Sequence, residues 1–464
     1  MCKNARSYKK SDRSKRAANL LQSFVECITA FDDIFEKTCL YNKKSDKKSP
    51  LDYSEYVKEL NWTDVCSVVW SLSRLDEAVN SIHTDKDSKV ECITAKIIAM
   101  AAQYCTELQS LSLEPRELST HDYLQSCFAS IKSLPRLRHF VWGSSMSEND
   151  ALCQLATIAQ NLESITINHC YQNVDFISEN IALLVRSQHR LKSFTVKHGD
   201  LEMYAILDLL QAHANSLESI TFSGVVLRQN REVESVQFSK LKCIKIDTCT
   251  HISNSSWEPL LAADFPILRE FVCETHDSKV QELTKFIYGH GGALTTLLLT
   301  GQRISNTCSK AIIESCHNLT LLSVSINAET VFFIAKIIAN LPKLHSVVLT
   351  NSGFWYEQAI DLLFSGLSKY WLPNLYQMEL KSVDSFQTNF LERFLSKSNP
   401  PLRSLIINNR VGVTEECLNL IIEYLYSTLE ILKVGFKKEC ISESCIQKVK
   451  SVIKTFELYE YHVV

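Results

Sequence analysis

The chain has 464 residues, of which 45% are hydrophobic and 22% are charged. This length predicts about three ordinary domains or one elongated repeat array, and the balance of residue types is that of a folded protein. The formal net charge of −3 creates no strong field for nucleic acid, so we expect no nucleic-acid partner.

The first 48 residues form a basic, polar segment that we expect to be partly disordered. Residues 1–16 carry seven lysines and arginines and no Leu, Ile, Val or Phe, and residues 42–48 carry four lysines. Such stretches bury too little apolar surface to offset the entropy lost on ordering. A solvated tail is the simplest interpretation, and a nuclear-localisation signal is the alternative.

Targeting and redox signals predict a cytoplasmic or nuclear protein. No apolar core follows the basic N-terminus and no run of 18 apolar residues occurs, so we expect neither a secretory signal nor a membrane partner. The 17 cysteines should then be reduced thiols. Cys440 and Cys445 lack a second ligand pair at zinc-finger spacing, so we expect no metal and no other cofactor.

Residues 49–105 are expected to form a mainly helical N-terminal cap region with one short strand. The apolar stretch from Ile93 to Cys105 predicts the helix that precedes the first clear repeat. Residues 106–464 then form a repeat array.

One frame, Leu-x-x-apolar-x-apolar, occurs thirteen times between residues 108 and 434. Its first leucines are 24 to 31 residues apart, with a mean spacing of about 27, which is the period of leucine-rich repeats. The thirteen first leucines are Leu108, Leu137, Leu162, Leu191, Leu217, Leu241, Leu268, Leu294, Leu319, Leu344, Leu375, Leu402 and Leu429.

The periodicity predicts an α/β leucine-rich-repeat solenoid, or horseshoe. Each apolar-x-apolar pair has the period of a strand that buries one face. Between frames the period becomes helical: the sets Ile334, Ile337, Ile338, Leu341 and Leu418, Ile421, Ile422, Leu425 each mark one helix face. Parallel strands should therefore line the concave face and helices the convex face.

The C-terminal end predicts a cap for the last repeat. Ile446, Val449, Ile453 and Phe456 have the spacing of a final helix. Tyr459, Tyr461 and Val463 alternate, which predicts a closing strand.

Cysteines at fixed places in the repeat define its subtype. Cys105 and Cys316 lie three residues before a frame, and Cys170 and Cys249 lie three residues after one, the latter followed by Ile252-Ser253-Asn254. The pattern resembles the cysteine-containing leucine-rich repeat of F-box proteins. We interpret each cysteine as a small buried side chain at a tight turn.

Residues 49–464 resemble a large fungal family of F-box/leucine-rich-repeat proteins. The segment Ser49 to Leu60 (SPLDYSEYVKEL) is similar to the segment that follows the F-box in that family. The resemblance implies a substrate-receptor subunit of an SCF-type ubiquitin ligase, with a Skp-type adaptor and a cullin as partners. Residues 1–48 contain no proline and no tryptophan, and no F-box is recognisable in this chain. The alternative is a free-standing scaffold or inhibitor with no ligase link.

No catalytic constellation accompanies the repeats, so we expect a non-enzymatic protein. Gly289-His290-Gly291-Gly292 resembles the oxyanion loop of some esterases, but the chain has no G-x-S-x-G nucleophile elbow. Its place between a helix and a strand favours a helix C-terminal turn.

The strand residues between the buried positions should face the concave side, where a protein target would bind. Many are Ser or Thr, which suit a solvated strand face. Exposed aliphatics with a charged edge are instead typical of protein contacts. The candidate residues are Val272, Leu298, Val348 and Ile406, with Glu270, Glu274 and Glu379. The target is unknown, and we expect a monomer outside its complex.

Overall fold

The computed structural model describes residues 58–74, 90–91, 93–95, 97–98, 107–114, 134–144, 150–169, 179–228, 236–249, 254–274, 280–301, 304–351, 359–383, 387–409, 413–436 and 441–460. The basic segment predicted over residues 1–48 lies outside this part of the chain. The chain divides into two compact units. Unit 1 contains residues 1–201 and 205–217, and unit 2 contains residues 202–204 and 218–464.

Unit 1 contains parallel strands that pair in chain order. They are β1 (Glu59–Asn61), β2 (Ser110–Leu113), β3 (His139–Ser144), β4 (Ser164–His169) and β5 (Ser193–Glu202). The helices are α3 (Trp62–Arg74), α6 (Asp150–Ile158), α7 (Glu179–Arg186) and α8 (Met203–Gln211), the last of which begins at the division between the units.

Within the described residues, unit 2 has the same alternation of parallel strands and helices, with more strands than unit 1. Its strands are β6 (Ser219–Arg228), β7 (Cys243–Asp247), β8 (Glu270–Glu274), β9 (Thr296–Leu299), β10 (Leu321–Ile326), β11 (Ser346–Asn351), β12 (Gln377–Val383), β13 (Ser404–Asn409), β14 (Ile431–Phe436) and β15 (Thr455–Glu460). Each pairs in parallel with the next.

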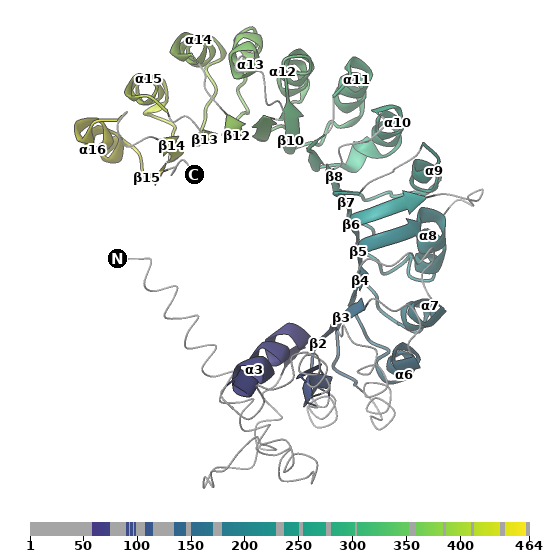
Figure 1. The fold of residues 1–464 in the computed structure, drawn as a ribbon. Helices are drawn as coiled ribbons and strands as arrows, with labels where there is room; N and C mark the ends of the chain where they lie inside the picture. Colours follow the sequence, from purple (N-terminus) through teal and green to yellow (C-terminus); the bar gives the residue numbers. More distant parts are fainter. Residues whose placement is uncertain are drawn as a thin grey trace. The chain divides into compact units, whose positions relative to one another are not determined.

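The helices of unit 2 alternate with its strands. They are α9 (Asn254–Ala262), α10 (Val280–His290), the short 3-10 helix η3 (Gly291–Ala293), α11 (Asn306–Ser315), α12 (Val331–Asn340), α13 (Ala359–Leu367), α14 (Thr388–Ser398), α15 (Glu415–Leu425) and α16 (Glu443–Val452). Within unit 2 the strands lie on the inner side of an arc and the helices on its outer side (Figure 1).

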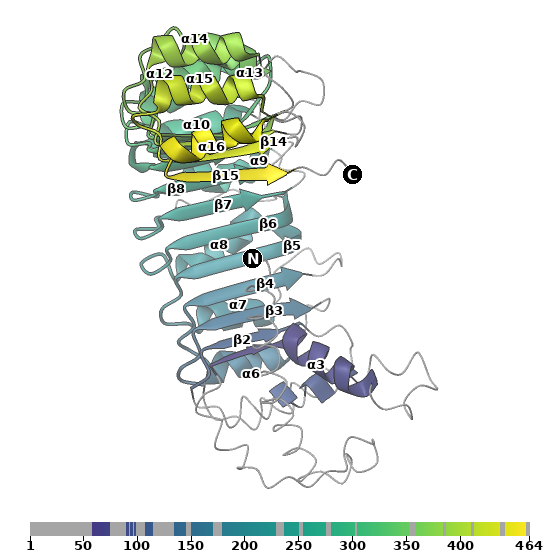
Figure 2. The ribbon, with the colours of Figure 1, turned by 90° about the vertical axis from the view of Figure 1, so that its left-hand side faces the viewer.

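The predicted α/β repeat solenoid with parallel strands is confirmed. All thirteen frames fall on strands β2 to β14, and their first leucines are only 0 to 5% exposed. Figure 2 shows the strands of each unit edge to edge and running in one direction. Each buried leucine contributes about 1.5–3 kcal/mol of hydrophobic stabilisation, so the repeated frame accounts for a large part of the core.

Hydroxyl side chains fix where three helices begin. Ser305, Thr414 and Ser442 each accept a hydrogen bond from the backbone N–H of a cysteine three residues later. These cysteines, Cys308, Cys417 and Cys445, are buried. A polar cap next to a small buried thiol therefore starts each of these helices at a defined residue.

The two helix faces predicted from the sequence are confirmed, since all eight of their apolar residues are buried in or next to α12 and α15.

The predicted extent of the last helix was wrong. Helix α16 ends at Val452, and Phe456 lies in β15, where it pairs with Leu432. Phe456 thus occupies the first strand position of another frame. Tyr459 lies in β15, whereas Tyr461 and Val463 fall outside the described residues.

The region predicted to cap the N-terminus is described only in part. Strand β1 pairs with β2, and α3 follows β1 directly. Residues 90–91, 93–95 and 97–98 are helical, and the rest of the stretch to Cys105 lies outside the described residues. The boundaries 1–48, 49–105 and 106–464 stay predictions.

Candidate partner-binding face

Register brings side chains of successive strands into rows on the face of unit 2 that points away from its helices. One row, the central row, crosses β7 to β14 at the middle outward position of each strand. The pairing places these residues side by side in the order Lys245, Val272, Leu298, Ser323, Val348, Glu379, Ile406 and Lys433. Five of the seven candidate residues therefore lie in one row: Val272, Leu298, Val348, Glu379 and Ile406.

The exposure of Val272 was predicted wrongly. Its side chain lies on the outward side of β8, yet it is only 6% exposed. Register places Lys245 and Leu298 beside it, one strand spacing of about 4.8 Å away on either side. Leu298, Val348 and Ile406 are partly exposed, as expected.

Two aliphatic residues that the sequence analysis passed over join this surface. Leu321 and Ile431 are partly exposed and lie one outward position before the central row, on β10 and β14. The signal was present, because both residues directly precede a buried frame position on a predicted strand. We call Leu298, Leu321, Val348, Ile406 and Ile431 the aliphatic stripe.

Glu270 and Glu274 flank Val272 on β8, at the edge of the aliphatic stripe. Lys245 lies 3.0 Å from Glu270, and hydrogen bonding to Glu270 raises the pKa of the Lys245 ammonium. Asp247, which pairs with Glu274 across the sheet, accepts a hydrogen bond from Ser223 at 3.1 Å. The outward positions of β7 and β8 thus hold three carboxylates and one ammonium.

Charged residues also interrupt the stripe at β12 and lie at its end on β14 and β15. Glu379 lies between Val348 and Ile406 in the central row, its side chain 18% exposed and 3.6 Å from Lys381. On β14 and β15, Lys433 lies 3.0 Å from Glu457. Charged residues therefore lie at both ends of the aliphatic stripe, and one carboxylate interrupts it.

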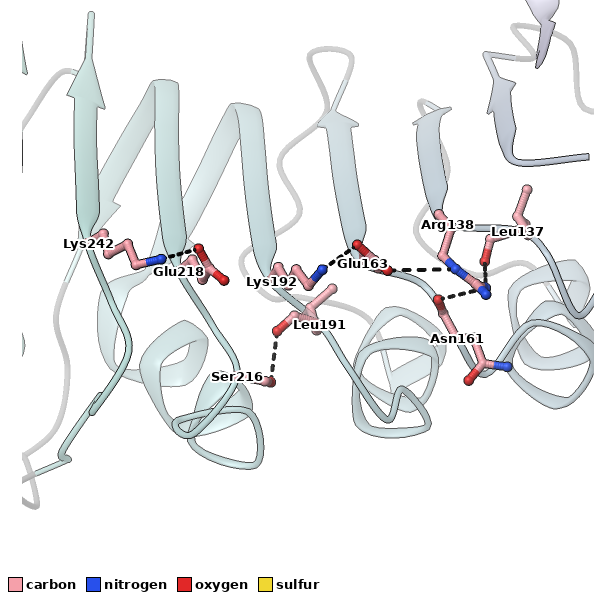
Figure 3. A network of polar contacts seen from close by, with 9 residues as sticks. All are labelled: Leu137, Arg138, Asn161, Glu163, Leu191, Lys192, Ser216, Glu218 and Lys242. Carbon is pink, nitrogen blue, oxygen red and sulfur yellow. Dashed lines mark hydrogen bonds and ion pairs between the residues drawn. The ribbon is translucent and has the colours of Figure 1, made fainter. Parts of the chain in front are cut away.

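A second feature absent from the sequence analysis is a ladder of ion pairs where the strands begin (Figure 3). In unit 1, Glu163 accepts from Lys192 at 2.7 Å and lies 3.7 Å from Arg138, and the hydrogen bond from Lys192 lowers the pKa of Glu163. In unit 2, Lys242 donates to Glu218 at 2.7 Å. Each of these residues directly follows a frame leucine, so charge alternation at that position was the available signal. Exposed pairs of this kind stabilise little, at most about 1 kcal/mol each.

The glycine-rich motif ends a helix, as the sequence predicted. Helix α10 ends at His290 and η3 begins at Gly291. The His290 ring packs 5.1 Å from Phe265 and 4.8 Å from Phe286, and burial lowers its pKa. A side chain at position 291 would approach Cys316 Sγ and Ser315 Cβ to 2.9 Å, so glycine is needed for close packing.

The cysteines that the structure describes include several fully buried thiols. Burial raises the pKa of both Cys308 and Cys316 to about 12, and the pKa of Cys249 to about 11. Such thiols are almost entirely protonated near neutral pH and react slowly. This supports the structural interpretation of Cys249 and Cys316, while Cys105 and Cys170 lie outside the described residues.

Among the described residues, no three His, Cys, Asp or Glu side chains are grouped so that they could hold a metal ion. In the same residues, no helix has the length and apolar character needed to span a membrane.

The repeated strand and helix, the parallel pairing in chain order and the buried frame leucines define the described chain as a leucine-rich-repeat-like solenoid. No family model matches the chain, and no curated protein matches it. Among solved structures it is similar to a chain in the crystal structure of the Rad7 and Elc1 complex in yeast. The identity is 14%, the match covers 85% of this chain and 86% of that chain, and the TM-score is 0.34. The functional argument therefore depends on the residues of this chain.

Proposed function

We propose that the protein is a non-enzymatic recognition solenoid that binds a protein target on the strand face of unit 2. The observation that carries the proposal is the aliphatic stripe, whose five members lie in two adjacent rows on β9, β10, β11, β13 and β14. A strand face that only meets water would carry polar side chains at these positions, as Thr296, Ser346 and Ser404 do on the same strands. Partly exposed aliphatics gathered in one place favour a protein contact.

The resemblance of residues 49–464 to F-box/leucine-rich-repeat proteins supports a more specific role. We propose that the solenoid is the substrate-receptor subunit of an SCF-type ubiquitin ligase in the cytoplasm or nucleus, with a Skp-type adaptor and a cullin as partners. The rival proposal is a free-standing scaffold or inhibitor, favoured by the lack of a recognisable F-box in residues 1–48.

Affinity purification of the full chain, followed by quantitative mass spectrometry, tests both target binding on the strand face and the ligase role. The face variant Leu298→Glu/Val348→Glu places two carboxylates on the aliphatic stripe. The control variant Phe332→Glu changes an exposed residue of α12, on the helix side of unit 2. We expect the face variant, but not the control, to lose the target by at least about tenfold, the equivalent of about 1.4 kcal/mol.

Recovery of a Skp-type adaptor and a cullin with both wild type and face variant would support the ligase role. Their absence from every sample, with a target that still depends on the aliphatic stripe, would favour the scaffold. Equal recovery of all captured proteins by wild type and face variant would contradict target binding on this face.

A further inference from the structure

We infer that the occupant of the aliphatic stripe is an amphipathic α-helix of the partner, which lies across β9 to β14 with a basic side chain over Glu379. The inference rests on the proposed function and specifies the chemistry of the target. Three independent features of the face lead to it: its backbone, its spacing and its charge.

The backbone of β9 to β14 cannot form sheet hydrogen bonds with an extended ligand. Strands β9 to β14 pair with a neighbour on both sides, so their N–H and C=O groups point along the sheet and are already used. An extended peptide laid over the stripe would bury its own backbone groups against aliphatic side chains, which is costly. A helix satisfies its backbone internally and presents only side chains.

The spacing of the stripe fits a helix that runs across the strands. Neighbouring strands are about 4.8 Å apart and one helical turn advances about 5.4 Å, so each turn meets roughly one strand. The five steps from β9 to β14 span about 24 Å, or about 16 helical residues.

The positions of the stripe also alternate between two rows. Leu298, Val348 and Ile406 lie in the central row, while Leu321 and Ile431 lie one outward position before it. Apolar residues spaced alternately three and four apart zigzag along a helix in the same way, because a step of three residues falls short of one 3.6-residue turn and a step of four exceeds it.

The charges of the face set the polarity of its partner. A helix on the stripe would remove water from Glu379, whose one ion-pair partner among the described residues is Lys381, at 3.6 Å. A lysine or arginine of the helix would compensate for that loss of water. Beyond β9, the three carboxylates of β7 and β8 outnumber Lys245, so basic residues or the positive helix N-terminus are favoured at that end.

The test is a selection of random 16-residue peptides on phage against the immobilised full chain, with Leu298→Glu/Val348→Glu for counter-selection. We expect the selected peptides to carry apolar residues at i, i+3 or i+4 and i+7 with a lysine or arginine between them. Their helical circular-dichroism signal should rise on binding. Peptides with strictly alternating apolar residues, peptides insensitive to the face variant, or no enrichment at all would each overturn the inference.

A charge exchange then tests the contact with Glu379. For a selected peptide, Glu379→Lys should weaken binding at least about tenfold, and replacing the basic residue of the peptide by glutamate should restore it. Glu392→Lys, a reversal on the exposed side of α14, is the control and should leave affinity unchanged. An unchanged affinity with Glu379→Lys would overturn the predicted contact.

The two proposals fail separately. If the face variant loses its cellular target while no helical peptide is selected, target binding on this face stands and the helix inference is wrong. If helical peptides bind the stripe while no cellular protein depends on it, the proposed function is wrong and the face merely has the shape and charge to hold a helix.

Discussion

The side-chain carbonyl of Gln188 accepts a hydrogen bond from the backbone N–H of Leu162 at 2.9 Å. Gln188 follows α7, is 5% exposed, and donates from Nε2 to the carbonyl of Leu184 at 2.8 Å. Leu162 is the first leucine of the frame on β4. One buried amide therefore connects the end of α7 to the first leucine of the frame on β4, the strand that precedes α7 in the chain.

Gln188→Leu should destabilise unit 1 by about 1–3 kcal/mol, because the Leu162 N–H loses its partner in a buried position. Urea unfolding measures the loss, and hydrogen exchange at the Leu162 amide should accelerate. Gln160→Leu, at an exposed position, is the control and should change stability by less than about 0.5 kcal/mol. Similar effects of the two substitutions would contradict the role of this hydrogen bond.

Adjacent leucines on β9 test the alternation of the strand. Leu297 is fully buried whereas Leu298 is partly exposed. Leu297→Asp should cost several kcal/mol, about 3–5, because it buries an unpaired carboxylate, and Leu298→Asp about 1 kcal/mol or less. Thermal unfolding measures the loss of stability in both variants. A larger loss for Leu298→Asp than for Leu297→Asp would mean that the strand faces the other way.

Three glycines near the end of α10 provide a matched steric test. Gly291→Ala should destabilise unit 2 by about 1–3 kcal/mol, since the new methyl group would meet Cys316 and Ser315 at 2.9 Å. Gly289→Ala and Gly292→Ala introduce a methyl group with nothing within 4 Å and serve as controls. Melting temperatures that fall equally for all three would point to backbone conformation rather than packing.

Stability should fall in mild acid because of His213. This histidine is 4% exposed, its Nε2 lies 2.8 Å from the carbonyl of Val185, and burial lowers its pKa. The unfolded chain then binds the proton more readily than the folded chain. The stabilisation from neutral His213 is therefore fully present above the ordinary histidine pKa of about 6.5, and the free energy of unfolding decreases as the pH falls below that value.

Urea unfolding at a series of pH values between about 8 and 5 measures this dependence. His213→Gln should flatten the curve of unit 1, and His189→Gln, at an exposed position, should leave its slope unchanged. A wild-type curve that rises towards acid would contradict the prediction. His290 in unit 2 should act in the same direction, because burial lowers its pKa too.

The buried thiols should resist alkylation in the native protein. With the pKa of Cys308 and Cys316 at about 12, almost no thiolate forms at pH 8. We expect peptide mass spectrometry to find both cysteines unmodified after iodoacetamide treatment of the folded chain and modified after treatment in urea. Rapid labelling of either residue in the folded chain would show that the frame around it opens.

The fold could be predicted from the sequence because its signal is local and repeated. A buried leucine such as Leu319, three residues after Cys316, marks each turn of the solenoid, and thirteen copies leave little ambiguity. The closing strand was harder to predict, because Phe456 fits a helical spacing with Ile453 and also a strand spacing with Leu458. Pairing with β14 decides between them, and that contact is not local.

The candidate face could be predicted only as far as the direction of its side chains. Alternation places Val272 outward, but register places Lys245 and Leu298 beside it, and its side chain is only 6% exposed. Leu321 and Ile431 were missed although their place directly before a buried frame residue was a local signal of an outward position. Whether a side chain is accessible depends on residues about 25 positions away in the chain, and no local pattern reports those.

Pairing in chain order has a consequence for synthesis on the ribosome. Within each unit the strand that follows finds its partner roughly one repeat earlier, as β11 does with β10. Every new repeat therefore meets a docking surface that has already emerged, and no strand waits for a distant C-terminal partner. We expect each unit to grow from its N-terminal end during translation, so that a stalled, truncated chain would still hold the repeats it contains.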